Sequence, residues 1–342
     1  MSDATSVGGL PPHAQLIQMG TAFWGSQILF VAAQLGIADR LAGGTRASSE
    51  LAGEIGLNAA AFYRFLRTLA GMGLLTEVRS KAFALTPLGE ALKKDAPGSA
   101  YASILTLAGP IGQRSWGLLA YSLETGKTGL EKALGQPLFD YLSERPREAS
   151  LFSETMVGFH GAEPPAVAAA YDFSGLRTIV DVGGATGNML VHILRRHRGP
   201  RGVLFDLPHV VTDAPAFLAA HGVADRVSIE SGSFFERVPV GHDAYLLSHI
   251  IHDWDAAQCR TILSNCRRAL DPKGRLLIVE MVLPEGDAPH PGKMLDMMML
   301  VGPGGQERTP SEYAELLGKA GFKLAKVVPT ASAVSIVEAV PV

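Results

Sequence analysis

The second half of the chain alternates short apolar runs with segments of helical periodicity. From about residue 173 the apolar runs read RTIVDVGG, GVLFDLP, RVSIESG, DAYLLS and GRLLIVEMVL. Segments such as GNMLVHILRRH and DAAQCRTILSNCRRAL, whose apolar residues recur at helical spacing, lie between these runs. Because strands that alternate with helices pair side by side in parallel, this half predicts an α/β fold with a doubly wound parallel sheet.

The first half has a different pattern. Between about residues 14 and 172 the apolar residues recur at helical spacing, and glycine, proline and asparagine residues separate several helices. Within it, residues 47–75 predict two short helices joined by a turn, and residues 76–86 predict a small hairpin, which is a winged-helix layout. A chain of 342 residues, of which 47% are hydrophobic, is long enough to form two cores.

The winged-helix pattern makes a ligand-sensing DNA regulator one candidate function. Such a regulator needs a basic recognition helix, whereas the basic residues of the segment 57–71 are Arg64 and Arg67 alone. Over the whole chain, 30 Lys and Arg residues oppose 33 Asp and Glu residues, which gives a net charge of -3. This balance provides no general attraction for nucleic acid or an acidic membrane surface, so neither is an expected partner.

The N-terminal segment and the cysteines also bear on location. Residues 1–15 lack the basic flank and apolar core of a signal peptide, so we expect a cytoplasmic protein. Polar residues interrupt the apolar stretch from Ala22 to Leu41, which predicts an amphipathic helix rather than a span of about 20 apolar residues. Cys259 and Cys266 fit one helix face and indicate neither a disulfide framework nor a zinc site.

A glycine-rich turn, VDVGGATG at residues 180–187, follows the first predicted strand of the second half. Glycines here let the backbone approach a ligand closely at a helix N-terminus. The dinucleotide pattern GxGxxG requires glycine where this chain has Ala185, but Asp206 lies 19 positions after Gly187, where a carboxylate can accept both ribose hydroxyls. The turn and Asp206 predict an adenosine-containing cofactor and leave NAD and S-adenosylmethionine as alternatives.

Five separated motifs point to one family. They are Asp181 before the glycines, FDLPHVV, SGSFFE, LLSHIIHDWD and GPGGQERTPSEY. With these motifs in this order, the chain resembles the S-adenosylmethionine-dependent O-methyltransferases of plant phenolics and bacterial natural products. The N-terminal segments FWGSQILFVAAQLGIADRLA and FDYLSERPREASLFSETM are also similar to that family's dimerisation helices and inner pocket wall.

The resemblance implies a fold and a domain order. We expect a winged-helix-like dimerisation domain at residues 1–110 and a helical linker at 111–172 that contributes to the substrate pocket. A Rossmann-like catalytic domain at 173–342 would bind S-adenosylmethionine and release S-adenosylhomocysteine. The implied partners are a second copy of the chain and a small aromatic hydroxylated substrate.

The resemblance also implies which residues hold the cofactor. Gly183 would lie under its methionine part, Asp206 would hold the ribose, and Ser248 would contact its carboxylate. The family more often carries Asp where this chain has Ser233. The full set of implied cofactor-binding residues is Asp181, Gly183, Asp206, Leu207, Ser233, Phe234 and Ser248.

His252 is the catalytic base that the resemblance implies. Methyl transfer needs the acceptor oxygen about 3 Å from the methyl group and in line with the leaving sulfur. A phenol with a pKa near ~10 must lose its proton, which an imidazole with a reference pKa of ~6.5 can accept. Glu280 and Glu307 match family positions that flank this histidine, where a carboxylate would orient the ring. Their alternatives are a strand-end carboxylate paired with arginine and a solvated loop charge, respectively.

The expected substrate pocket is apolar, and the methionines at 297–299 would help to exclude water from it. For Asp253 two roles stay open, contact with the substrate and support of His252. The residues expected to line the pocket are Met156, Asp253, Met298 and Gly302.

His249 and His252 form an HxxHD pattern that could ligate a metal. The run from Asp243 to Ser248 predicts a strand, and residues three apart in a continuing extended chain point to opposite faces. We therefore expect no metal, and we interpret His249 as a packed or hydrogen-bonded histidine. Asp255, with Gln258 three positions later, predicts a capping box at the start of the next helix.

The leading prediction is an O-methyltransferase that acts on a phenolic or heteroaromatic hydroxyl of a secondary metabolite, as in antibiotic biosynthesis. One alternative is a cofactor-binding homologue that catalyses hydroxylation or decarboxylation, against which His252, Glu280 and Glu307 argue. The other is the winged-helix regulator. The sequence does not predict the identity of the methyl acceptor.

Overall fold

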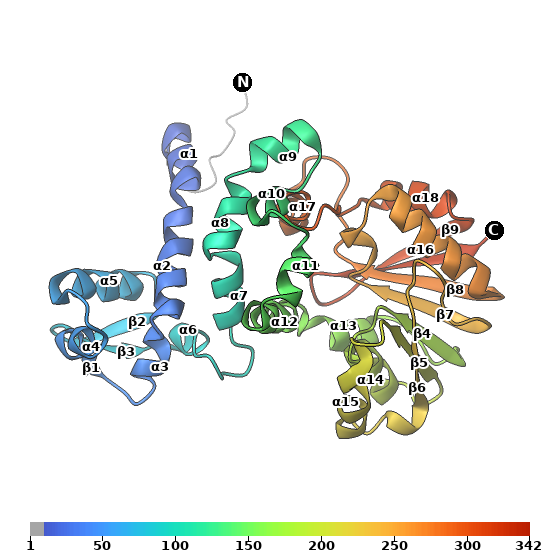
Figure 1. The fold of residues 1–342 in the computed structure, drawn as a ribbon, viewed down its shortest axis with the longest axis horizontal. Coiled ribbons are helices and arrows are strands. Elements are labelled where there is room, and N and C mark those ends of the chain that lie inside the picture. Colours follow the sequence, from blue (N-terminus) through green and yellow to red (C-terminus); the bar gives the residue numbers. More distant parts are fainter. Residues whose placement is uncertain (1–9) are drawn as a thin grey trace. The chain divides into compact units, whose positions relative to one another are not determined.

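The computed structural model describes residues 10–342 (Figure 1). The chain forms two compact units. One comprises the residues up to Arg114 together with Phe139–Phe159, and the other comprises Ser115–Leu138 and His160–Val342. The chain passes between the units within residues 111–172, the segment predicted as a linker. The domain boundaries at 110 and 172 remain predictions.

The first unit contains the predicted winged-helix layout. The side chain of Asn58 accepts a hydrogen bond from the backbone of Ala61 and so begins helix α5. One face of α5 is buried through Phe62, Leu66 and Leu69. Strand β3 pairs antiparallel with both β1 and β2. The elements are α3 (Ile37–Leu41), β1 (Arg46–Ala47), α4 (Ser48–Ile55), α5 (Ala59–Gly71), β2 (Leu75–Arg79), β3 (Ala82–Leu85), α6 (Pro87–Glu90), α7 (Tyr101–Leu107), α8 (Pro110–Trp116) and α12 (Pro146–His160).

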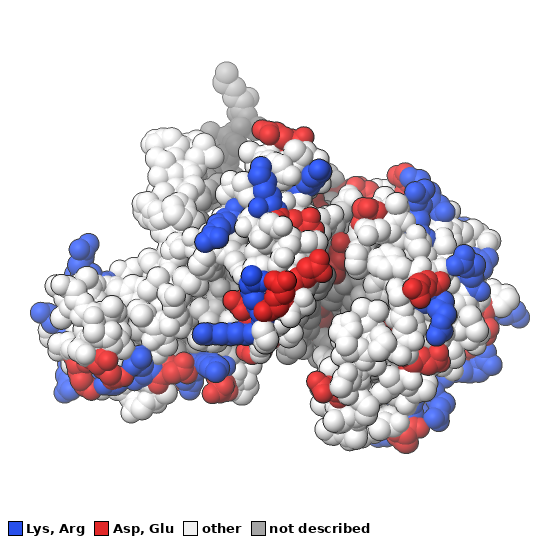
Figure 2. All heavy atoms as spheres, viewed as in Figure 1, with Lys and Arg blue, Asp and Glu red and all other residues white. Residues whose placement is uncertain are grey.

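Two apolar helices, α1 (Pro12–Thr21) and α2 (Phe23–Gln34), open the described chain. The amphipathic helix predicted from Ala22 to Leu41 is instead divided, because Gly36, with a φ of 62°, separates α2 from α3. Several large apolar side chains of α1 and α2 are exposed, and Figure 2 shows this region as a surface without charged groups. By length and composition alone, the 23 residues Pro12–Gln34 could cross a membrane.

A seven-stranded sheet forms the centre of the second unit, in the order β6-β5-β4-β7-β8-β10-β9. The first five strands in this order pair in parallel, as predicted. The last two are antiparallel to their neighbours and were not among the strands that the sequence predicted. A short turn joins β9 to β10, and such a turn permits only antiparallel pairing. The strands are β4 (Thr178–Val182), β5 (Arg201–Asp206), β6 (Val227–Ser231), β7 (His242–Ser248), β8 (Leu270–Glu280), β9 (Phe322–Pro329) and β10 (Ser335–Pro341).

Helices cover both faces of this sheet (Figure 1). In β7, Tyr245 and Leu247 belong to one buried cluster and Leu246 to the other, because successive side chains of a strand point to opposite faces. The three layers are those of a Rossmann-like domain. The helices of this unit in chain order are α9 (Leu119–Thr125), α10 (Gly129–Leu134), α13 (Glu163–Ala170), α14 (Asn188–Arg196), α15 (Ala214–Ala220), α16 (Ala256–Ala269), α17 (Pro291–Val301) and α18 (Pro310–Gly318). Helix α11 (Leu138–Ser143) belongs, from its second residue on, to the first unit.

The strand order determines where a ligand can bind. Strand β4 lies between β5 and β7, so the chain reverses its direction across the sheet at this point. Ligands of doubly wound proteins bind outside the carboxyl ends of the strands at such a switch point. The capping box of Asp255 and Gln258, which begins α16 just beyond the carboxyl end of β7, is confirmed.

Candidate functional site

The glycine-rich turn after β4 is packed so closely that a side chain does not fit at two of its positions. Gly183 has a φ of 75°, and a Cβ atom there would lie 2.4 Å from Cδ1 of Ile250. A Cβ atom at Gly184 would lie 2.5 Å from the carboxylate of Asp181. A turn without side chains here lets the backbone approach a ligand closely at the start of α14.

Asp206, the last residue of β5, lies beside the same turn. Its Oδ2 accepts a hydrogen bond from the backbone nitrogen of Ala185 at 3.0 Å, and its Oδ1 accepts one from that of Leu207 at 2.7 Å. These bonds fix the carboxylate, and each oxygen keeps a lone pair that can accept from a ligand hydroxyl. The side chain of Leu207 is partly exposed beside it.

Asp181 is buried beneath the turn. Its Oδ2 accepts no hydrogen bond from any residue in the described part of the chain. Burial, together with the negative charge of Asp206, raises the pKa of Asp181 to about 7. A donor group of a ligand in the crevice would satisfy this oxygen and favour the ionised carboxylate.

Aromatic side chains border the turn on the side of β6. A Cβ atom at Gly183 would lie 3.6 Å from the ring of Phe234, whose centroid is 6.0 Å from that of Trp254. The hydroxyl of Ser233 accepts a hydrogen bond from the backbone of Phe235 at 3.3 Å. Ser248 ends β7 near the same edge. Flat rings, fixed carboxylates and an open backbone turn together fit an adenosine-containing ligand.

A buried histidine lies with two buried carboxylates beyond β7 and β8. Nδ1 of His252 is 2.7 Å from Oε1 of Glu307, and its backbone nitrogen donates to Oε1 of Glu280 at 3.0 Å. The exposed fractions of His252, Glu280 and Glu307 are 7%, 0% and 1%. The structure thus brings the three predicted catalytic residues together, and burial of Glu307 excludes its alternative as a solvated loop charge.

The carboxylates determine the protonation of His252. Because Glu307 accepts the hydrogen of Nδ1, the lone pair of the neutral ring is on Nε2. Burial opposes protonation, but the hydrogen bond to Glu307 and the charge of Glu280 outweigh it and raise the pKa of His252 to about 9. The ring can therefore take a proton on Nε2 and hold it as a stabilised imidazolium.

Residues outside the predicted site hold this arrangement. Tyr313 donates a hydrogen bond to Oε2 of Glu280. Arg308 donates to the backbone oxygen of Ile251 at 3.2 Å rather than pairing with Glu280. The backbone nitrogen of Gln306 donates to the backbone oxygen of His252 at 2.8 Å. Tyr313 and Arg308 both belong to the motif GPGGQERTPSEY, which was the available signal for them.

His249 belongs to a second cluster. Strand β7 ends at Ser248 and His249 has a φ of 54°, so the chain turns instead of continuing extended. The prediction that His249 and His252 point to opposite faces is therefore wrong, and their ring centroids are 5.1 Å apart. Nε2 of His249 lies 2.6 Å from Oε2 of Glu163, which is 3.0 Å from Nδ1 of His160. His249 is hydrogen-bonded, as one interpretation expected.

The predicted pocket residues lie at several places. Oδ1 of Asp253 is 3.6 Å from Nε2 of His252, which is too long for a hydrogen bond. Met298 of α17 adjoins Gly302, where a Cβ atom would lie 2.8 Å from the Met298 carbonyl oxygen. Met156 belongs to α12 in the first unit. The pocket-lining role of these residues remains a prediction.

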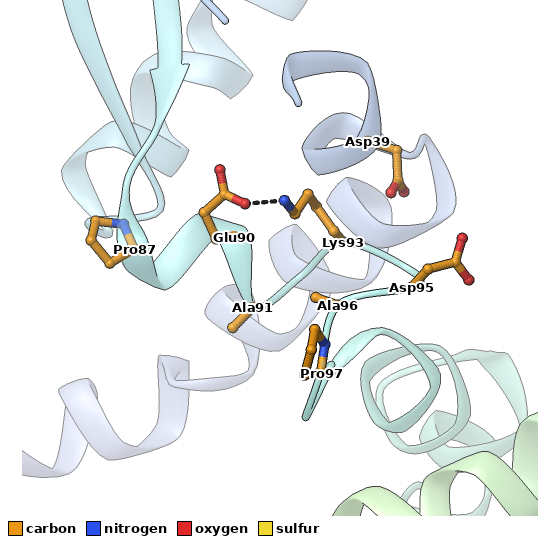
Figure 3. A pocket seen from close by; sticks show the side chains of 8 residues that line it. All are labelled: Asp39, Pro87, Glu90, Ala91, Lys93, Asp95, Ala96 and Pro97. Atoms are coloured by element: carbon orange, nitrogen blue, oxygen red, sulfur yellow. Dashed lines mark ion pairs between the residues drawn. The ribbon is translucent and has the colours of Figure 1, made fainter. Parts of the chain in front are cut away.

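A separate hollow of about 670 Å³ lies in the first unit (Figure 3). Figure 3 shows the ion pair of Lys93 and Glu90 on its wall. It contains none of the predicted site residues, and its mixed lining suggests no particular chemistry. The lining residues are Asp39, Pro87, Glu90, Ala91, Lys93, Asp95, Ala96 and Pro97.

The sequence matches two models of one family. The O-methyltransferase domain matches residues 116–323, and the O-methyltransferase dimerisation domain matches residues 17–95. The chain belongs to the O-methyltransferase family. Membership in the O-methyltransferase family also offers a reason for the apolar surface of α1 and α2, since the dimerisation domain includes the second half of α1 and all of α2.

Known O-methyltransferases resemble the chain over almost its full length. The phenazine O-methyltransferase PhzM of Lysobacter antibioticus is 42% identical over 100% of both chains. The crystal structure of LaPhzM covers 97% of this chain and 100% of its own, with 43% identity and a TM-score of 0.89. NcsB1, an O-methyltransferase from neocarzinostatin biosynthesis, was solved with S-adenosylmethionine and 2-hydroxy-5-methyl naphthoic acid. It covers 93% of this chain and 96% of its own, with 31% identity and a TM-score of 0.80.

The chain is therefore an S-adenosylmethionine-dependent O-methyltransferase of secondary metabolism. The family requires no metal for methyl transfer. The choice between NAD and S-adenosylmethionine, which the glycine turn left open, is thereby made for S-adenosylmethionine. The regulator alternative finds no support among these relatives.

Substitution of Asp206 by Asn is expected to weaken S-adenosylmethionine binding about 10- to 100-fold, the cost of losing hydrogen bonds to a charged acceptor. An amide would also present N–H groups to the backbone nitrogens that now donate to this carboxylate. Titration calorimetry checks the affinity. Asp213→Asn, at an exposed position in the 3-10 turn Val211–Asp213, is the matched control. Equal affinities of the two variants would contradict the role of Asp206.

Proposed function

We propose that this enzyme methylates a hydroxyl group of a small phenolic or heteroaromatic metabolite, with His252 as the general base. The observation that carries the proposal is the hydrogen bond from Nδ1 of His252 to the buried Glu307. Because Nδ1 carries the hydrogen, the lone pair of the ring is on Nε2 and points away from Glu307. The naphthoic acid bound in NcsB1 and the phenazine substrate named for PhzM support an aromatic acceptor.

The proton transfer follows from this geometry. Nε2 of His252 takes the proton of the acceptor hydroxyl, which leaves the oxygen with the electron pair that a methyl group would take up. The charge that appears on the ring is balanced by Glu307 at Nδ1 and by Glu280 at the backbone of His252. Tyr313 holds Glu280, so the second carboxylate stays fixed as the ring changes charge. These residues lower the barrier by being in place before the proton moves.

When bound, S-adenosylmethionine supplies an activated methyl group. Around it, Asp206 would accept hydrogen bonds from the ribose hydroxyls and Phe234 would pack against the adenine, with Leu207 and Ser233 nearby. Asp181, Gly183 and Ser248 face its methionine part. The unpartnered oxygen of Asp181 and the side-chain-free turn at Gly183 support this placement.

The remaining parts of the proposal concern the pocket and the assembly. Met156, Asp253, Met298 and Gly302 line the acceptor pocket. The match to a dimerisation domain and the exposed apolar side chains of its first helices support a homodimer. A cytoplasmic location remains a prediction.

The proposed base predicts how the rate depends on pH. Below the pKa of about 9 the ring of His252 is protonated and cannot accept a proton. We expect kcat/KM to rise with pH, to reach half of its maximum near pH 9 and to level off above it. This constant reports the ionisations of the free enzyme and the free substrate. Steady-state rates between pH 6 and pH 10, about three units below and one above the midpoint, check this expectation.

Ionisation of the acceptor itself could give a similar pH profile, so a variant must separate the two. Glu307→Gln removes the main interaction that raises the pKa of His252. The midpoint of the profile should therefore move to lower pH in this variant. An unchanged midpoint in Glu307→Gln, with the same acceptor, would show that the acceptor titrates and not His252.

A further inference from the structure

A cluster of ionisable side chains next to His252 takes no part in the proposed proton transfer. It consists of His160, Glu163 and His249, and one nitrogen or oxygen of each lies within 4.8 Å of the others. Oε2 of Glu163 is the central atom, 2.6 Å from Nε2 of His249 and 3.0 Å from Nδ1 of His160. The imidazole rings of the two histidines are stacked, with centroids 3.8 Å apart.

We propose that His160, Glu163 and His249 form a binding site for a divalent transition-metal ion of the Zn²⁺ type. Two imidazole nitrogens and one carboxylate oxygen are a ligand set that Zn²⁺ takes in sites with an open fourth position. Imidazole ligands also suit Ni²⁺, Co²⁺ and Cu²⁺, whereas Mg²⁺ and Ca²⁺ prefer oxygen ligands alone. The expected ion is therefore one of the former group.

The distances leave room for such an ion after a small movement. A tetrahedral Zn²⁺ with bonds of about 2.1 Å holds its ligand atoms about 3.4 Å apart. The two bonded contacts of Glu163, at 2.6 and 3.0 Å, are shorter than this by less than an ångström. If the carboxylate of Glu163 shifts outward by this amount, its hydrogen bonds to the two histidines are replaced by three bonds from the cluster to the metal.

The three ligands lie at the ends of separate elements. His160 is the last residue of α12, Glu163 is the first of α13, and His249 follows the last residue of β7. His249 reaches Glu163 from a left-handed backbone conformation, with a φ of 54°, which is uncommon outside glycine. Non-glycine residues in such conformations cluster at functional sites, where the surrounding structure holds them.

The ligand set combines the carboxylate of the buried Glu163 with two imidazole rings. Methyl transfer in this family is metal-independent, so the ion adds to the enzyme without being needed for its reaction. Its open position would accept water or a donor atom of a ligand.

Binding of Zn²⁺ to the untagged full-length protein, measured by titration calorimetry, tests the proposal. We expect one ion per chain, and an affinity at least about tenfold lower in His160→Ala, His249→Ala and Glu163→Gln. His209→Ala, at an exposed position outside the cluster, should bind as the wild type does. Co²⁺ should give the visible absorption of a tetrahedral nitrogen and oxygen site in the wild type and in His209→Ala, but not in the three cluster variants.

Two results would overturn the proposal. One is the absence of saturable Zn²⁺ binding by the wild type, which would leave a hydrogen-bonded cluster. The other is equal affinity of Glu163→Gln and His209→Ala, provided that both unfold at the wild-type temperature. Because the titration contains neither S-adenosylmethionine nor an acceptor, its outcome is independent of whether His252 is the base.

Discussion

Replacement of His252 by alanine is expected to slow methyl transfer by about 10²- to 10⁴-fold, the usual contribution of a general base. The affinity for S-adenosylmethionine should change little, because the residues placed around it lie on β4, β5 and β7 and the loop after β6. Rates at saturating cofactor, together with titration calorimetry of the cofactor, separate the two effects. His209→Ala serves as the matched histidine control, since this side chain is exposed and has no role in the proposal.

The acidity of the acceptor gives this prediction a sharper form. A phenol that is already ionised at the assay pH needs no base, so the loss caused by His252→Ala should shrink as the acceptor pKa falls. Rates of the wild type and of His252→Ala with a series of substituted phenols show how this loss depends on the acceptor pKa. An equal loss for every acceptor would contradict the base assignment and would indicate a positioning role for His252.

Gly305→Ala is expected to destabilise the protein by about 3 kcal/mol, the upper end of what an overpacked position costs. A Cβ atom there would lie 1.7 Å from the backbone oxygen of His252, and neither backbone can yield without breaking the bond from Gln306 to that oxygen. The same displacement would separate Nδ1 of His252 from Glu307, which follows Gln306 in the chain. We therefore expect methyl transfer to fall by about 10²-fold or more, as for loss of the base.

Gly318→Ala is the control for this substitution. Gly318 ends α18, and a Cβ atom there would meet no described atom within 4 Å. Alanine favours helix over glycine, so this variant should be at least as stable as the wild type. Urea unfolding of both variants gives the comparison. Equal stability of the two would show that the loop at 304–306 yields freely and does not fix His252.

Local patterns in the sequence were sufficient for much of the fold. The alternation of strands and helices predicted the parallel part of the sheet, and the spacing of Asp255 and Gln258 predicted a capping box that is present. The glycine turn and Asp206 were predicted to bind one cofactor, and the backbone nitrogen of Ala185 donates a hydrogen bond to Asp206 directly. These features depend on residues that are close in sequence, or on the edge of the sheet at which the loops after parallel strands meet.

Features that depend on distant contacts were missed. His249 reaches Glu163, 86 positions away, because the chain turns left-handed after β7, and nothing in the residues near His249 requires that turn. The antiparallel strands β9 and β10 were missed because no helix separates them. The prediction depended on strands that alternate with helices. The hydrogen bond from Tyr313 to Glu280 likewise joins two residues that lie 33 positions apart in the sequence.

The most direct test of the proposed function is to identify the methylated product. The enzyme is incubated with methyl-labelled S-adenosylmethionine and a panel of phenols, naphthols and hydroxyphenazines, each paired with its amino analogue. We predict label on the oxygen of at least one hydroxylated ring compound, located by mass spectrometry and NMR. Label confined to nitrogen, or no labelled product from any compound although the cofactor binds, would contradict the proposal.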